Sequence, residues 1–121
     1  MIGPLRGVRV LDFGQGVAGP YCAQLLGDHG ADVIKIEPPR GDWARGMGAG
    51  GNDGNSGPFL SVNRNKRGMV LDLRLEAARD VVRSLVRHAD VLVESFRPGV
   101  MDRMELGFDA LRELQPRLVY V

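Results

Sequence analysis

Three glycines early in the chain have the spacing of a nucleotide-binding loop. Gly14, Gly16 and Gly19 form G-x-G-x-x-G directly after one apolar run, and Glu37 ends the next. In dinucleotide sites such glycines let the backbone approach a pyrophosphate, and the acidic residue binds a ribose hydroxyl. The same glycines also suit a helix that packs tightly on a strand. The pattern therefore leaves two hypotheses, a stand-alone NAD-binding domain and a tightly packed βαβ unit that serves another ligand.

Cationic side chains near the second and third apolar runs bear on the choice of ligand. Coenzyme A (CoA) shares its adenosine and pyrophosphate with NAD but carries an extra phosphate on the ribose. A carboxylate would repel that phosphate, whereas Lys and Arg would bind it, unless they are ordinary solvated surface charges. The cations in question are Lys35, Arg40 and Arg45, followed by Arg64, Lys66 and Arg67 of the segment NRNKR.

The elements that would position these residues alternate between strands and helices. Apolar runs predict strands over residues 8–13, 32–37, 69–73, 90–94 and 118–121. Helices are expected over residues 20–28 and 75–89, and in two short pieces near 100–104 and 109–114. This alternation predicts an α/β fold with a mostly parallel sheet. Ligand groups should then gather beyond the carboxyl ends of the strands, at residues 14–19, 37–40, 72–74 and 95–97.

The glycine-rich segment GMGAGGNDGNSG, residues 46–57, contains six glycines. It buries too little side chain to offset the entropy that is lost on ordering. We therefore expect a mobile loop or lid within a single domain over residues 1–121.

Composition excludes several classes of function. The chain has 121 residues, 44% hydrophobic and 26% charged, which suits one soluble globular domain. Its 16 Lys and Arg nearly balance 15 Asp and Glu, so no global field would attract nucleic acid or an anionic membrane. No apolar run approaches the ~20 residues of a membrane span. A lone Cys22 and the lack of a Cys/His cluster predict a cytoplasmic protein with neither a disulfide nor a metal site.

Four longer segments carry a more specific signal than the glycine loop. They are PLRGVRVLDF (4–13), AGPYCAQLLGDHGADVIKIEPPRGD (18–42), NRNKRGMVLDL (63–73) and ADVLVESFRPGVMDRMELGFDALRELQPRLVYV (89–121). In combination they resemble the N-terminal part of the family III CoA-transferases, the group that includes formyl-CoA transferase, the carnitine CoA-transferases and α-methylacyl-CoA racemase. The resemblance implies a Rossmann-like α/β region of an interlocked homodimer. It also implies CoA or acyl-CoA as the ligand, rather than NAD.

Carried over position by position, the resemblance places CoA contacts in the first loop, after the basic segment and after the fourth strand. The family often has an arginine directly after the glutamate of GADVIKIE, where this chain has Pro38, so Arg40 is the candidate for the adenine contact. The family also often has asparagine where this chain has the shorter Ser95. The expected contacts are Val17, Ala18, Arg40, Leu71, Asp72, Leu73, Arg74, Ser95, Phe96, Arg97 and Arg103.

The resemblance also implies where the chemistry lies. In the transferases an aspartate forms an acyl anhydride and then a CoA thioester, and in the racemase a His and an Asp exchange the α-proton. Those residues match positions beyond Val121, so we expect no catalytic residue here and a fragment that is inactive alone. The expected function is the CoA-binding part of an enzyme that moves CoA between an acyl-CoA and a carboxylic acid. A racemase fragment and the NAD-binding domain remain alternatives.

Overall fold

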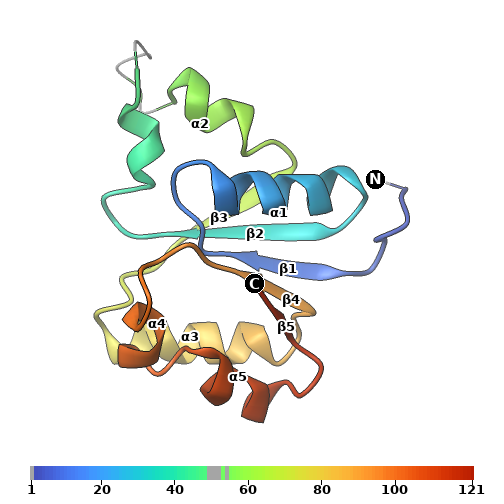
Figure 1. Cartoon of the computed structure of the whole chain (residues 1–121), viewed down its shortest axis with the longest axis vertical. Helices are drawn as coiled ribbons and strands as arrows, with labels where there is room; N and C mark the ends of the chain where they lie inside the picture. Colours follow the sequence, from blue (N-terminus) through green and yellow to red (C-terminus); the bar gives the residue numbers. More distant parts are fainter. Residues whose placement is uncertain (1, 49–52, 54) are drawn as a thin grey trace.

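A parallel sheet lies between two layers of helices (Figure 1). The computed structural model describes residues 2–48, 53 and 55–121. The five strands have the order β3-β2-β1-β4-β5, and every neighbouring pair is parallel. They are β1 (Arg9–Asp12), β2 (Asp32–Glu37), β3 (Lys66–Val70), β4 (Val91–Val93) and β5 (Val119–Tyr120). The predicted α/β class is confirmed.

The helices are divided between the two faces of the sheet. On one side lie α1 (Ala18–Asp28) and α2 (Gly57–Ser61), and on the other α3 (Glu76–Val86), α4 (Val100–Arg103) and α5 (Phe108–Leu114) (Figure 1). A single 3-10 turn, η1 (Trp43–Gly46), follows β2. Within the described ranges, no helix combines the length and apolarity that crossing a bilayer would require.

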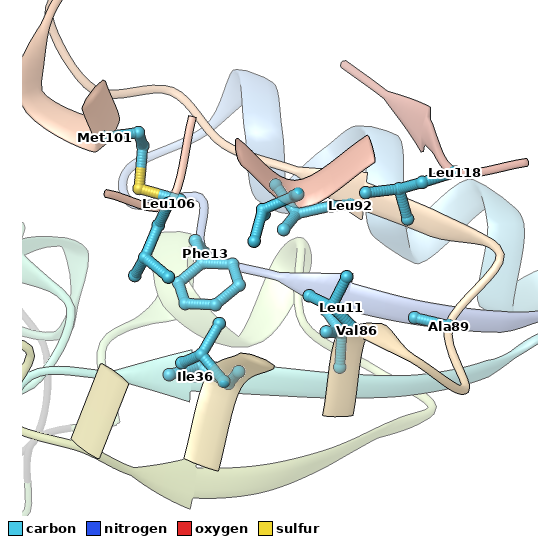
Figure 2. Packing of buried hydrophobic residues seen from close by; sticks show 11 residues of the cluster. Leu11, Phe13, Ile36, Val86, Ala89, Leu92, Met101, Leu106 and Leu118 are labelled. Carbon is cyan, nitrogen blue, oxygen red and sulfur yellow. The ribbon is translucent and has the colours of Figure 1, made fainter. Parts of the chain in front are cut away.

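The larger core fills the space between the sheet and α3 to α5. Leu11, Phe13, Ile36 and Leu92 project from this face of the sheet toward Leu106 and the helices (Figure 2). Successive strand residues point to opposite faces, so the alternate residues of the same strands form a smaller cluster beneath α1. That cluster contains Val10, Ala23, Ala31, Val33 and Val93.

The third strand begins three residues earlier than predicted. Residues 66–70 pair with residues 33–37 of β2, whereas the sequence pattern placed the strand at residues 69–73. The prediction was wrong because it followed the apolar residues and treated the cationic start of the strand as loop. Residues 71–73 consequently follow β3 and lie at the carboxyl edge of the sheet, where ligand groups were expected.

The glycine-rich segment 46–57 contains parts of regular elements at both ends. Gly46 closes η1, and Gly57 opens α2, whose first turn is capped by the Ser56 side chain. Neither element was predicted. The expected mobile loop falls largely on residues 49–52 and 54, which lie outside the described residues.

Candidate functional site

A cleft of about 530 Å³ opens at the carboxyl edge of the sheet. β1 lies between β2 and β4, so the strand order reverses there, which is where open α/β sheets bind ligands. The charged side chains of the lining are Glu37, Arg40, Asp72 and Arg74. Its apolar lining comes from the ends of β1, β2 and β3 and from the segment after β4: Phe13, Ile36, Pro38, Pro39, Leu71, Leu73, Phe96, Val100 and Met104.

The cleft collects about half of the predicted contacts and leaves the others outside its lining. Those inside are Arg40, Leu71, Asp72, Leu73, Arg74 and Phe96, whereas Val17, Ala18, Ser95, Arg97 and Arg103 do not line it. The predicted edge segment 37–40 contains Pro38 and Pro39, and both line the cleft. Sequence reasoning missed four apolar lining residues, because an apolar side chain in a predicted strand or helix gives no sign that it faces a cleft: Phe13, Ile36, Val100 and Met104.

Two arginines supply positive charge to the cleft. Arg74 forms a bidentate pair with Asp72, at 2.7 Å and 2.8 Å, while its side chain stays 85% exposed. The hydrogen bonds from Arg74 lower the pKa of Asp72 to about 2, so both partners are charged at neutral pH. Arg40 is exposed and makes no ion pair with any described residue. Both guanidinium groups are therefore accessible to an anionic ligand.

Three backbone N–H groups of the glycine loop, at residues 14–16, donate to side chains of the protein. Gly14 N donates to Asp12 Oδ1 at 2.8 Å, Gln15 N donates to Ser95 Oγ at 3.2 Å, and Gly16 N donates to Asp42 Oδ1 at 3.0 Å. A dinucleotide site needs the backbone at the second glycine for its pyrophosphate. In this loop those donors already have acceptors.

Glu37, the expected ribose ligand of the NAD hypothesis, is also fully engaged. Its carboxylate accepts from Arg45 Nε and Nη2 at 2.8 Å and 2.6 Å and from Asp42 N at 2.7 Å. Burial alone would raise the pKa of Glu37, but these hydrogen bonds outweigh it and lower the pKa. The Phe59 ring lies 3.8 Å from Arg45 Cζ and covers the pair. The geometry does not support the NAD hypothesis.

Most of the cations that favoured CoA have structural partners instead. The side chain of Lys66 is buried, and its Nζ contacts Asp12 Oδ2 at 2.8 Å and the Pro20 carbonyl at 2.8 Å. Arg64 pairs with Asp28 at the end of α1, and Arg67 pairs with Asp32 at the start of β2. Lys35 is buried as well. Of the cations that favoured CoA, the cleft contains Arg40.

Val17 and Ala18 lie at the amino end of α1. Both are exposed, and Val17 is an N-cap residue without a side-chain hydrogen bond to the helix. The first turn contains no acidic residue, and Pro20 has no N–H to satisfy. Such a helix end attracts an anionic group.

Arg97 lines a second, smaller cleft of about 330 Å³ beside α4 and β5. Its other charged residues, Glu94, Asp102 and Asp109, are acidic. Arg103 is exposed on α4, the helix whose first residue, Val100, lines the larger cleft. Across the part of the chain that the structure describes, no group of three His, Cys, Asp or Glu side chains is arranged to hold a metal ion.

The structure is an α/β domain with a cleft at its topological switch point. Comparison with known proteins identifies the family: the model of CoA-transferase family III matches residues 5–121. The chain therefore belongs to CoA-transferase family III, and the resemblance inferred from its sequence segments is confirmed.

Relatives show how much of the family's length is present. The succinyl-CoA:mesaconate CoA-transferase of Haloarcula hispanica is 46% identical, with 98% of this chain and 31% of the relative covered. The formyl-CoA:oxalate CoA-transferase of Streptomyces avermitilis is 42% identical, with 96% and 28% covered. The chain thus spans about a third of the length of these curated relatives.

Solved structures share the same fold. The D175A mutant of Rv3272 from Mycobacterium tuberculosis superposes with a TM-score of 0.90 at 45% identity, covering 98% of this chain and 32% of that one. A CAIB/BAIF family protein from Brucella suis gives a TM-score of 0.90 at 39% identity, with 99% and 33% covered.

Proposed function

We propose that this chain forms the CoA-binding part of an enzyme that transfers CoA between carboxylic acids. Membership of CoA-transferase family III gives the class of reaction. The observation that carries the proposal is the cleft, which brings Arg40, residues 71–74 and Phe96 to one edge of the sheet. The named relatives are CoA-transferases, which favours transfer over the racemase alternative.

The chemistry of the cleft suits the adenosine end of CoA. A planar, weakly polar adenine fits between the prolines after β2 and the leucines after β3. Arg40 and Arg74 then bind the phosphate on the ribose, since a guanidinium matches phosphate geometry and remains charged at all relevant pH values.

The remaining predicted contacts would lie beside the parts of CoA other than its adenosine end. The uncapped start of α1 at Val17 and Ala18 favours the pyrophosphate. Ser95, Arg97 and Arg103 come from the segments after β4 and would reach the ligand from the other side of the switch point. Because Ser95 Oγ already accepts from Gln15 N, its role would be to hold the loop beside the ligand.

We also propose that the catalytic nucleophile belongs to the rest of the enzyme. An aspartate in a region of the family outside this chain acts as the nucleophile, forming first an acyl anhydride and then the CoA thioester. The enzyme is a cytoplasmic homodimer with an acyl-CoA and a carboxylic acid as substrates. In this proposal residues 1–121 bind CoA but do not turn over substrate, because covalent catalysis needs the nucleophile itself.

Calorimetric titration with CoA, 3′-dephospho-CoA and NAD at one salt concentration tests the binding function. We expect CoA to bind, 3′-dephospho-CoA to bind about ten-fold more weakly because it lacks the phosphate that the arginines hold, and NAD not to bind. Binding of NAD without a preference for CoA would overturn the proposal.

A further inference from the structure

Four buried charges form a network directly beneath the glycine loop. The side chains of Asp12, Lys35, Asp42 and Lys66 are each at most 3% exposed. Lys35 Nζ lies 2.9 Å from Asp42 Oδ2, and Lys66 Nζ lies 2.8 Å from Asp12 Oδ2. Two positive and two negative charges thus balance in the interior.

A network of this kind is a costly way to stabilise a fold. Removing ions from water has a large desolvation cost, and apolar side chains of similar volume often serve stability equally well. The network does, however, hold the loop backbone in one conformation. Asp12 accepts from Gly14 N, and Lys35 Nζ donates to Gly14 O at 2.7 Å.

Asp42 is the member with an unusual donor set. Its Oδ1 accepts from Gly16 N at 3.0 Å and from Ala44 N at 2.9 Å, and its Oδ2 faces the Lys35 ammonium. Two backbone N–H groups and one ammonium therefore converge on a single carboxylate. Proteins use such convergent backbone donors, with a neighbouring cation, to bind phosphate.

Trp43 closes the other approach to the same glycine. Gly16 has φ +82°, and a Cβ placed there would overlap the Trp43 ring. Trp43 follows Asp42 directly, so the hydrogen bond from Ala44 N to Asp42 also fixes the turn that carries the indole.

We propose that Asp42 is an internal anion in the phosphate site of the glycine loop. Its carboxylate holds Gly16 and the Trp43 turn in the shape that the ligand site requires, and it keeps a ligand phosphate away from the N–H groups of Gly16 and Ala44. Asp42 is thus a positioning and specificity-determining residue. Its effect on CoA affinity rests on the proposed function, whereas its occupation of the anion site does not.

The test compares Asp42→Ala, which empties the site, with Asp42→Asn, which keeps an oxygen for both N–H groups but removes the charge. Asp28→Ala is the matched control, because it also removes an ion-paired carboxylate, one at the far end of α1. Each variant is titrated with CoA, and its thermal midpoint is followed with added sodium formate or orthophosphate. The amide resonances of Gly16 and Ala44 report on the two N–H donors.

We expect Asp42→Ala to bind CoA about ten-fold more weakly than the unmodified chain and to recover both affinity and thermal midpoint when formate fills the site. Orthophosphate should stabilise Asp42→Ala more than the unmodified chain, in which the Asp42 carboxylate already fills the site. Asp42→Asn should retain the Gly16 and Ala44 amide shifts and show no response to formate, and Asp28→Ala should bind CoA normally.

Unchanged CoA binding by Asp42→Ala, or a loss that neither anion reverses, would overturn the proposal. If Asp42→Ala is unfolded without formate and folds with it, the anion site is supported directly. If the unmodified chain fails to bind CoA, the proposed function is wrong, and the formate response and the amide shifts still decide the role of Asp42.

Discussion

Lys66 and Asp12 meet at 2.8 Å between two strands that are not neighbours. Lys66 opens β3 and Asp12 closes β1, while β2 lies between them in the sheet. The same ammonium contacts the Pro20 carbonyl in the first turn of α1. One buried side chain therefore ties together β3, the end of β1 and the start of the helix behind the glycine loop.

Replacing Lys66 with Met should destabilise the fold by about 3–5 kcal/mol, because Asp12 would keep a buried charge without its closest partner. Arg67→Met is the control: its pair with Asp32 is largely exposed, and its loss should cost about 0–1 kcal/mol. Urea unfolding of both variants measures the difference. Equal losses of unfolding free energy in the two variants would contradict this prediction. The buried pair of Lys66 and Asp12 would then stabilise the fold no more than the exposed pair of Arg67 and Asp32.

Glu37 should make stability depend on pH on the acid side. The hydrogen bonds from Arg45 and Asp42 hold its pKa in the folded chain below the usual 4.5. Between the folded and the usual value the unfolded chain binds more protons, so this stabilisation is present above pH 4.5 and is lost as pH falls through the folded pKa.

Thermal midpoints of the unmodified chain and of Glu37→Gln across that acid range isolate this contribution. Glu37→Gln should have a lower thermal midpoint than the unmodified chain at neutral pH. Its midpoint should also fall less on acidification. Glu113→Gln, a change at an exposed glutamate, is the control and should behave like the unmodified chain. Parallel acid profiles for Glu37→Gln and the unmodified chain would contradict the assignment.

The arginines of the cleft should discriminate between CoA and its dephosphorylated form. Arg40→Ala and Arg74→Ala should each weaken CoA binding about ten-fold, yet change 3′-dephospho-CoA binding little, because the lost partner is the ribose phosphate. The exposed Arg117 lies outside the lining of the cleft, and Arg117→Ala should bind both ligands normally. An equal loss of affinity for both ligands would mean that the arginines contact a part of CoA other than the ribose phosphate.

Gly16 should tolerate a side chain only if Trp43 is also changed. Gly7→Ala is the matched control, since Gly7 has φ +89° but open space where a Cβ would lie, and it should cost about 1–2 kcal/mol of backbone strain. Gly16→Ala should cost more, and Trp43→Ala should recover the excess in a double-mutant cycle. A cycle without coupling in unfolding free energy would mean that the indole does not restrict this loop.

The fold was largely predictable because its strands and helices carry clear apolar periodicities. Besides the two short elements η1 and α2, which were not predicted, β3 shows the limit of that approach. Lys66 and Gly68 belong to this strand through backbone pairing with β2 and through a buried ion pair, not through apolar side chains. A contact between residues 54 positions apart in the chain leaves no local pattern from which it could be inferred.

The candidate site was predictable only in part, for a related reason. Topology placed residues 72–74 and Phe96 at the carboxyl edge of the sheet, and the family resemblance added Leu71. The glycine pattern gave no sign that its N–H groups would be turned inward, because two of their three acceptors, Ser95 and Asp42, come from distant parts of the chain. Residue types at a given spacing can indicate a ligand loop, but they cannot show which donors remain available.

An amide resonance titration of this chain with CoA shows directly whether the ligand binds in the cleft. We expect the largest shifts at Arg40, residues 71–74 and Phe96, while the Gly14 and Gly16 amides keep their hydrogen bonds and their protection from exchange. Large shifts at Gly14 and Gly16, with residues 71–74 unmoved, would contradict this expectation and would place the ligand in the glycine loop after all.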